Sequence, residues 1–398
     1  MKDRKLYFES FLATLLVLLM VWLLFFLFSL SVKPLNFIAN SLKEVYLSDI
    51  YFSHIQEQKA DTSIVLVNIG ELDRTDIATL INLIGQNGPS AIGLDVLFSK
   101  NSPDKEGLDS IMSVAAKFND LIVLPVFYDQ LNNRPDERYH VITNVSKGHI
   151  NIISNQERTQ PVRYFHPVYQ ADNGDNYHSF ASKITSIVDQ DRFEAIKSRR
   201  VKREIINYFG GGDAFRTLEG PDILKGNFDY PSLIKDKVVL MGFLGIGKFS
   251  RLDDLSDKYY SPLNKTFFGR SHPDIYGLVI HANKIKMILE GDYIDQLSTW
   301  KLGLLTFVVV FIHMIAFIYF FVKKHVWYHI AAKLIQLFSL IIIVGLIFIS
   351  LDQINVLPDF IYLFMAIFLS VDILYLYEAL AIFAYKRFGW KSYFIKDH

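Results

Sequence analysis

The stretch Lys237–Asp295 decides the fold, because it joins the polar part of the chain to its apolar C-terminal part. It opens with KVVLMG (237–242), an apolar run that predicts a buried β-strand. A glycine-rich loop follows. The helical segment GLVIHANKIKMILEGDYI (277–294) then runs within a few residues into an uncharged apolar run that starts at Leu302. The sequence thus predicts a strand, a loop and one helix directly before a membrane segment.

The composition indicates a mixed architecture. Of the 398 residues, 51% are hydrophobic and 21% are charged, which is too apolar for an ordinary soluble protein and too charged for one that lies wholly in a membrane. The 41 basic and 41 acidic residues balance, so no nucleic acid partner is expected. The chain has no cysteine, which excludes disulfides and thiolate metal sites.

Four apolar runs are long enough to span a bilayer, since a helix needs about 20 apolar residues to cross it. The first is too long for a cleavable signal sequence and lacks a small-x-small cleavage site, so we interpret it as a retained anchor. The predicted segments are a cytoplasmic N-terminus (1–10), a transmembrane helix (11–32), an extracytoplasmic domain (33–299), three transmembrane helices (300–322, 330–351 and 359–385) and a short cytoplasmic tail (386–398).

The placement of Lys and Arg predicts that both termini lie in the cytoplasm. The N-terminal MKDRK is basic, the connection between the second and third spans holds Lys323, Lys324 and Lys333, and the connection 352–359 has no Lys or Arg. Basic residues concentrate on the cytoplasmic side of membrane proteins. We therefore expect residues 33–301 outside the cytoplasm.

This external part is predicted to be one α/β domain. Its periodicity predicts strands at 63–69, 91–98 and 121–127, helices at 76–86, 108–118 and 178–188, and a short strand at 205–209. Strands that alternate with helices imply a largely parallel sheet with right-handed crossovers and flanking helices.

An ordered set of motifs carries a family resemblance. The motifs are SAIGLDVLFS (90–99), VLP (123–125), RYFHPVYQADNGDNYHSFA (163–181), INYFGG (206–211), KVVLMGFLGIG (237–247) and GLVIHANKIKMILEG (277–291). With one apolar helix before and three after, this set resembles the CHASE2 sensor domain of bacterial receptors over about residues 33–294. The resemblance implies an extracytoplasmic sensory module in a multi-pass protein of the bacterial inner membrane. Such modules usually precede a cytoplasmic kinase or cyclase, whereas only KRFGWKSYFIKDH (386–398) follows here, so we expect the output in a separate protein.

The glycine-rich loop is a candidate ligand site. Gly242 and Gly247-Lys248 have the spacing of a phosphate-binding P-loop, but Phe249 stands where that motif needs Ser or Thr. Either a tight turn or a ligand cradle fits, because binding crevices of open α/β sheets lie at the carboxyl ends of strands. The candidate crevice comprises Asp95, Gly242, Gly245, Gly247, Asp253 and Asp254.

Other chemistry finds little support in the sequence. Asp253 and Asp254 show no regular spacing of oxygen ligands, so solvated loop acids are the alternative to a cation site. The histidines at 140, 149, 166 and 178 lack zinc-like spacing, and no nucleophile-elbow context is present. We expect no catalytic residues, no metal, no cofactor and no enzymatic activity.

Ionisable residues inside the predicted spans form two candidate pairs. His313 lies 13 positions after Trp300 and Asp372 lies 13 positions after Asp359, which predicts equal depth near the midplane. Lys333 and Glu378 lie near the inner ends of their spans. Because such residues are costly in lipid and usually paired, we predict the pairs His313–Asp372 and Lys333–Glu378, as contacts that hold the helices together or, alternatively, as a proton path.

The sequence therefore predicts a membrane sensor or receptor subunit. It would pass a signal through its helix bundle to a separate membrane or cytoplasmic effector, or assemble as a homo-oligomer in the lipid bilayer. The alternative is a structural or accessory subunit of an envelope complex that uses the domain as a docking surface. A transporter or a periplasmic enzyme is the third hypothesis.

Overall fold

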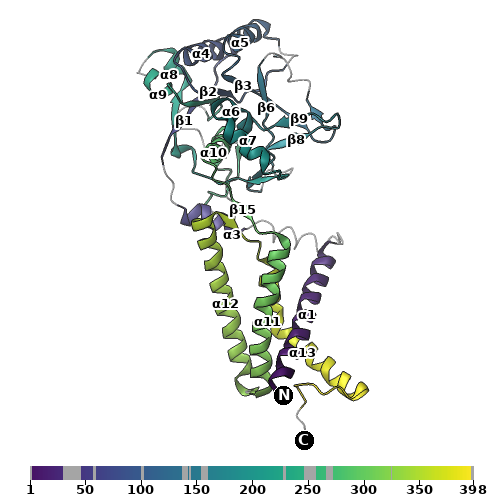
Figure 1. Ribbon diagram of the computed structural model, residues 1–398. Coiled ribbons are helices and arrows are strands. Elements are labelled where there is room, and N and C mark those ends of the chain that lie inside the picture. The colour runs from purple at the N-terminus through teal and green to yellow at the C-terminus, as the bar shows by residue number, and fades with distance from the viewer. Residues whose placement is uncertain are drawn as a thin grey trace. The chain divides into compact units, whose positions relative to one another are not determined.

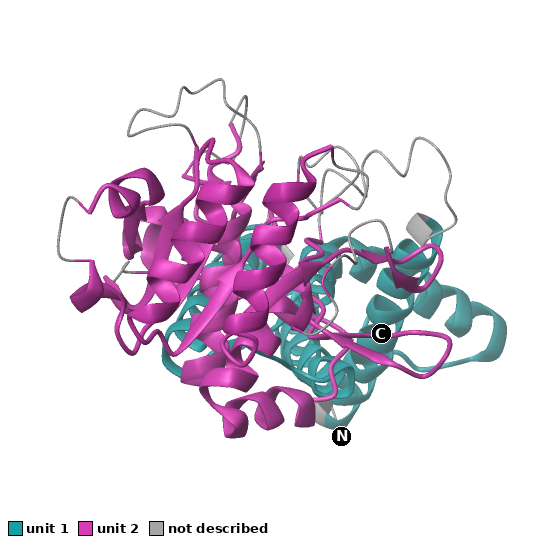
Figure 2. Ribbon diagram, turned by 90° about the horizontal axis from the view of Figure 1, so that it is seen from above, with its two compact units in different colours: residues 1–47, 295–398 teal, residues 48–294 magenta. Residues whose placement is uncertain are grey.

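The computed structural model describes residues 2–29, 46–56, 60–99, 103–136, 142, 145–153, 160–226, 230–245, 257–265, 272–323 and 325–395. The chain divides into two compact units, one of residues 48–294 and one of residues 1–47 with 295–398 (Figure 2).

A parallel sheet forms the centre of residues 48–294. Its strands lie in the order β11 (Phe215–Glu219), β1 (Asp61–Asn68), β12 (Val238–Gly242), β2 (Ala91–Leu94), β3 (Ile122–Val126) and β6 (Ser146–His149). The prediction of a largely parallel sheet is confirmed, because every pairing in this sheet is parallel. Although β12 comes late in the chain, it lies between β1 and β2, and all its residues are buried. The apolar run KVVLMG is thus a central strand.

Two strand predictions differ from the structure, and two strands were not predicted. The strand predicted for 91–98 ends at Leu94, and the segment predicted as a strand at 205–209 contributes only β10 (Glu204–Ile205), which pairs with β7 (Tyr164–Phe165) outside the main sheet. Both β6 (SKGH) and β11 (FRTLE) were missed. These two strands lie at the sheet edges, where the apolar pattern of a central strand is not required.

Helices cover both faces of the sheet (Figure 1). On one face lie α4 (Arg74–Gln86), α5 (Lys105–Lys117) and α8 (Gly220–Leu224), and on the other lie α6 (Phe180–Val188), α7 (Gln190–Ser198) and α10 (Gly277–Glu290). Alternate strand residues such as Val65, Val67 and Met241 join the core under α4 and α5. On the opposite face a Cβ at Gly93 would lie 2.5 Å from Ile184 Cδ1, so the glycine lets α6 pack closely.

The helix ends follow from local side chains. Asp73, Asp104 and Ser179 each accept a hydrogen bond from a first-turn backbone N–H and so cap α4, α5 and α6. Gly291 takes a left-handed conformation with φ 71° and ends α10. The helix predicted for 277–294 therefore stops at Glu290.

Short elements complete this unit. They are α3 (Leu47–Ile50), a π-helix (Tyr51–Ile55), a 3-10 helix (Gly212–Ala214), α9 (Pro231–Ile234), and the strand pairs β4 (Tyr128–Asp129) with β5 (Arg134–Pro135), β8 (Val168–Gln170) with β9 (Asn176–His178), and β13 (Lys258–Tyr259) with β14 (Ile275–Tyr276).

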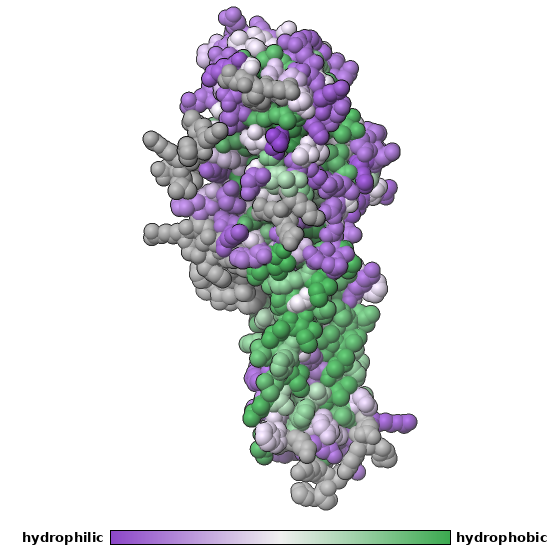
Figure 3. All heavy atoms as spheres, turned by 90° about the vertical axis from the view of Figure 1, so that its left-hand side faces the viewer, coloured by the Kyte–Doolittle hydropathy of each residue, from purple (hydrophilic) through white to green (hydrophobic). Residues whose placement is uncertain are grey.

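The second unit contains long apolar helices, over which hydrophobic side chains gather (Figure 3). Its elements are α1 (Lys2–Ser29), α11 (Thr299–Lys323), α12 (His325–Ile354), β16 (Val356–Leu357) and α13 (Ile361–Phe388), with β15 (Asp295–Gln296) before α11. Among the described residues, four helices are long and apolar enough to cross a membrane, at Arg4–Leu27, Thr299–Lys323, Val326–Ile354 and Ile361–Phe388. Each overlaps a segment predicted from the sequence, and α1 begins well before residue 11.

Candidate functional site

The carboxyl ends of the parallel strands bring two polar groups of residues together. The first is centred on Asn68 at the end of β1, whose Nδ2 donates to Glu219 Oε2 at 2.9 Å and to the Gly245 carbonyl at 3.0 Å. Its Oδ1 accepts from the backbone N–H of Leu244 at 2.9 Å. Asn68 is thus satisfied by the protein itself and fixes the loop after β12.

The glycines of that loop have different roles. A Cβ at Gly242 would lie 2.9 Å from Leu278 Cδ1 and 3.4 Å from the Cβ of Asp95, so this glycine allows α10 to approach the sheet beside Asp95. Gly245 has φ 97°, a conformation that other residues rarely adopt. The structure therefore supports a packing role for Gly242 and a tight turn at Gly245.

The second polar group lies between the sheet and α10, and we call it the charge cluster: Asp95, His149, His281 and Lys284. The last three are buried, and the side chain of Asp95 is 11% exposed. Asp95 directly follows β2, and His149 is the last residue of β6. His281 and Lys284 lie one turn apart on α10 and are each 2% exposed. The His281 Nε2 atom lies 4.0 Å from Asp95 Oδ2, and the two groups come from different layers of the domain.

Burial shifts the pKa of every group in the charge cluster. It raises the pKa of Asp95 to about 7, with a further rise from the charge of Asp257 and an opposing effect of Lys284. It lowers the pKa of Lys284 to about 7, against the attraction of Asp95. Burial and the Lys284 charge together lower the pKa values of His149 and His281 well below the ordinary value. Both imidazoles are therefore neutral near pH 7.

Several polar atoms of the charge cluster lack hydrogen bonds. Both ring nitrogens of His149 and the Nδ1 of His281 are buried and have no hydrogen-bond partner among the described residues. Aromatic rings pack on them instead, with Tyr169 4.5 Å from His149 and Phe180 5.2 Å from His281 between ring centroids. Buried polar groups without partners are rare and costly, so their retention points to a function.

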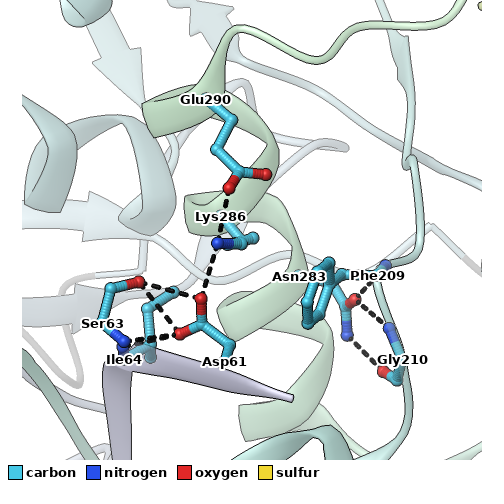
Figure 4. Close-up of polar contacts among 8 residues, drawn as sticks. All are labelled: Asp61, Ser63, Ile64, Phe209, Gly210, Asn283, Lys286 and Glu290. Carbon is cyan, nitrogen blue, oxygen red and sulfur yellow. Dashed lines mark hydrogen bonds and ion pairs between the residues drawn. The ribbon is translucent and has the colours of Figure 1, made fainter. Parts of the chain in front are cut away.

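Separate contacts hold α10 in place (Figure 4). Asn283 Oδ1 accepts from the backbone N–H groups of Phe209 and Gly210 at 2.7 and 3.1 Å, and its Nδ2 donates to the Gly210 carbonyl at 2.9 Å. Lys286 pairs with Asp61 at the start of β1. Since Leu278 packs near Gly242 at the carboxyl end of β12, α10 crosses the sheet antiparallel to its strands.

The predicted crevice is reproduced only in part. The structure brings Asp95 and Gly242 together and places Gly245 beside Asn68, whereas Gly247, Asp253 and Asp254 lie outside the described residues. The sequence did not single out His149, His281 or Lys284 as one site. The signal that could have found them is a lysine and a histidine on the apolar side of the 277–291 helix.

A groove between α4 and α5 lies on the other face of the sheet. Thr75, Asn82 and Lys117 are in its wall, and it holds none of the charge cluster. No group of three or more His, Asp or Glu side chains suited to a metal ion was found among the described residues.

No hydrogen bond or ion pair joins His313 to Asp372 among the described contacts. His313 Nδ1 donates to the Val309 carbonyl at 2.7 Å, so its Nε2 accepts, and the Ser339 hydroxyl donates to it at 2.8 Å. Asp372 is exposed on α13. Helix counting predicts the height of a residue along its helix, whereas the rotation of each helix, which decides which side chains face each other, was not available from the sequence.

The second predicted pair is likewise absent from the described contacts. Lys333 is exposed and Glu378 is half-buried, with no hydrogen bond or ion pair between them in the described bundle. A carboxylate that the sequence analysis assigned to the N-terminal tail is buried instead: Glu9 is 2% exposed and accepts from the hydroxyl of Tyr377 on α13. Gln336 also ties α12 to α13, through the Ile367 carbonyl at 2.7 Å.

Comparison with known protein families gives one match. The CHASE2 domain matches residues 13–318, which include α1 from Ala13 onward and most of α11 as well as the whole α/β unit. Searches of curated proteins and of solved structures gave no match. CHASE2 domains are extracytoplasmic sensor domains. Since the match covers most of its length, this chain belongs to the CHASE2 domain family.

Proposed function

We propose that this protein is a membrane sensor subunit that detects a signal outside the cytoplasm and passes it through its helices to a separate protein. The observation that carries the proposal is the charge cluster, which joins groups of the sheet (Asp95 and His149) to groups of α10 (His281 and Lys284). A signal that changes this cluster acts on α10, since half of the cluster belongs to that helix.

The chain that leaves α10 supports a path into the membrane helices. Residues 291–298 lead from α10 to α11, and within them β15 pairs with β16 in the connection between α12 and α13. The backbone N–H of Asp295 donates to the Asn355 carbonyl at 2.8 Å. A displacement of α10 would therefore act on α11 through the chain and on α12 and α13 through this strand pair.

Asp372 supports a partner in the membrane. It lies about 16 Å along α13 from Ile361, at 1.5 Å per residue, which is near the middle of a hydrocarbon layer about 30 Å thick. A carboxylate exposed at that depth is costly unless another helix covers it and donates to it. We propose that a helix of a separate protein, or of a second copy of this chain, packs on this side of α13.

The proposal assigns no chemical reaction to the site. The charge cluster contains acid–base groups, but no described serine or threonine hydroxyl is hydrogen-bonded to any of them. An activated nucleophile needs a base within hydrogen-bond distance. We accordingly propose binding and signalling, with no enzymatic turnover.

Coupling between the charge cluster and the helix bundle can be measured directly. Because the chain has no cysteine, labels attach only to the cysteines that are introduced. Spin labels at Tyr319→Cys on α11 and Phe383→Cys on α13, both exposed, report the distance between these helices in lipid nanodiscs. We expect Asp95→Asn and Lys284→Met each to shift the distance distribution, and Asp109→Asn on α5 to leave it unchanged. Identical distributions in all variants would overturn a sensor role and favour an accessory subunit.

The partner is tested by cross-linking in native membranes. Cysteines introduced at Phe368 and Leu376, on exposed positions of α13 near Asp372, should form a cross-link to another chain. Asp372→Leu should reduce that cross-link, while Asp359→Asn at the helix end should not. A cross-linked product of twice the chain mass identifies a homo-oligomer, another mass identifies a different partner, and a cross-link unaffected by Asp372→Leu removes Asp372 from the interface.

A further inference from the structure

Resting on the proposed sensor function, we infer that the stimulus of this domain is the proton, and that Asp95, His149, His281 and Lys284 form its binding site beneath α10. In a neutral imidazole one ring nitrogen accepts a proton and the other carries an N–H, so His149 has one unpartnered acceptor and one unpartnered donor, and His281 has an unpartnered Nδ1. Asp95 supplies a carboxylate on the sheet side, and Lys284 supplies an amine on the helix side. The site thus contains acceptors and donors of protons and leaves them free of structural hydrogen bonds.

The distance between Asp95 and His281 suits a contact that depends on a proton. At 4.0 Å the Nε2 and Oδ2 atoms are too far apart for a hydrogen bond, whose usual length is about 3 Å. An added proton shared by this pair would favour a shorter, charge-assisted hydrogen bond. Closing that gap requires α10 to move toward β2, because the two atoms belong to different layers.

The neighbouring charges come from every element around the charge cluster. Asp257 precedes β13 and acts on Asp95, while His166 after β7 and His178 on β9 act on His149. The strand β6 also carries Lys147, two residues before His149, and α6 contributes the ring of Phe180 and the half-buried Lys183. Lys284 lies 5.5 Å from the ring of Phe165, measured from its Nζ to the ring centroid.

The charge of the cluster reverses over a narrow pH interval. Burial moves the pKa of Asp95 up to about 7 and that of Lys284 down to about 7. Below this pH the carboxyl is neutral and the lysine is charged, and above it the carboxylate is charged and the lysine is neutral. Two protons are therefore exchanged near pH 7, and the charge passes from the helix side to the sheet side.

This change of charge acts on a helix, α10, whose second half is held to the rest of the domain. Asn283 and Lys286 hold the helix to residues 209–210 and to Asp61. Burial opposes ionisation of Asp61, but hydrogen bonds from Lys286, Ile64 and Ser63 outweigh it and lower the Asp61 pKa, so this contact stays intact over the pH interval. The end of α10 near Leu278 and His281 has no comparable ion pair in the described contacts. We expect the helix to tilt about its anchored half.

Infrared difference spectroscopy tests proton binding directly in the full chain in lipid nanodiscs. Between about pH 6 and pH 8 the carbonyl band of a protonated carboxyl should disappear with a midpoint near 7, in place of the value near 4 of an ordinary aspartate. The band should be absent in Asp95→Asn and retained in Asp109→Asn. A midpoint near 4 in wild type, or a carbonyl band that is unchanged in Asp95→Asn, would overturn the inference.

The spin-label distance between α11 and α13 separates this inference from the proposed function. Wild type should change its distance distribution between about pH 6 and pH 8, and Asp95→Asn and Lys284→Met should each lose most of that change. If these variants shift the bundle while pH does not, the sensor role stands and the proton is the wrong stimulus. If neither variants nor pH shift the bundle, the sensor role itself fails.

Discussion

Lys286 Nζ on α10 lies 2.6 Å from Oδ2 of Asp61, the first residue of β1 (Figure 4). Asp61 also accepts from the backbone N–H groups of Ser63 and Ile64 at 2.9 and 2.8 Å, and Lys286 has a second partner in Glu290 at 2.5 Å. The ion pair is largely buried, with Asp61 at 4% and Lys286 at 13% side-chain exposure. It fixes the second half of the helix that carries His281 and Lys284.

Loss of this ion pair should loosen α10. Lys286→Met leaves the buried Asp61 carboxylate without its cation, and the expected loss is about 2–3 kcal/mol in the free energy of opening of α10. Hydrogen exchange of α10 amides in the full chain measures it. Adding Asp61→Asn should recover part of the loss, and Lys183→Met on α6 serves as a half-buried control. Equal exchange in wild type and Lys286→Met would contradict the anchor role.

The same pair should give an acid-dependent stability. Burial disfavours the Asp61 carboxylate, but hydrogen bonds from Lys286, Ile64 and Ser63 outweigh it and lower its pKa. A lowered pKa stabilises the folded state above the unfolded value of about 3.9, and this contribution is lost as the pH falls through the folded value. Thermal unfolding should therefore show a shallower acid dependence below about pH 4 in Asp61→Asn than in wild type.

Asn283 should be the most sensitive polar residue of α10 to truncation. In Asn283→Ala the backbone N–H groups of Phe209 and Gly210 and the Gly210 carbonyl lose their partners inside the protein. The expected loss is about 2–4 kcal/mol in unfolding free energy, from two or more unsatisfied buried groups. Denaturant unfolding of the purified chain provides the measurement. Asn82→Ala on α4, whose contact with Lys117 is exposed, should cost less than about 1 kcal/mol.

Substitution of Gly245 should destabilise the domain because of its backbone conformation. Because its φ is 97°, Gly245→Ala is expected to cost about 1–2 kcal/mol and to weaken the bond from Asn68 Nδ2 to its carbonyl. Gly212→Ala is the matched control, since its added Cβ would meet Val279 Cγ2 only at 3.8 Å. Melting temperatures of the two variants decide the question. An equal, small effect at both positions would show that the loop tolerates a side chain.

The hydrogen bond between His313 and Ser339 should couple α11 to α12. In membranes such bonds contribute about 0.6 kcal/mol on average and up to about 1.7 kcal/mol. A double-mutant cycle of His313→Leu and Ser339→Ala in detergent unfolding should give a coupling energy in this range. The same cycle of His313→Leu with Asp372→Asn should give none. Coupling to Asp372 in place of Ser339 would restore the pairing predicted from the sequence.

The sequence by itself determined the elements that local chemistry specifies. The apolar runs of α1, α11, α12 and α13 follow from composition, and β1, β3 and β12 follow from the short apolar runs that they contain. The N-caps at Asp73 and Asp104 and the C-cap at Gly291 act within a few residues of the chain. Such signals need no distant partner, which is why the α/β class and the four long apolar helices could be predicted.

The tertiary structure decided which polar residues meet. Asp95, His149 and His281 are far apart in the chain, and the insertion of β12 between β1 and β2, with α10 across the sheet, places them in one buried site. The edge strand β6, which carries His149, pairs with β3 through backbone hydrogen bonds that cannot be predicted from its sequence. Likewise, the rotation of α11 and α12 about their axes brings His313 within hydrogen-bond distance of Ser339, while Asp372 on α13 stays exposed. Spacing along the chain fixes depth and periodicity, but packing alone fixes which side chains face each other.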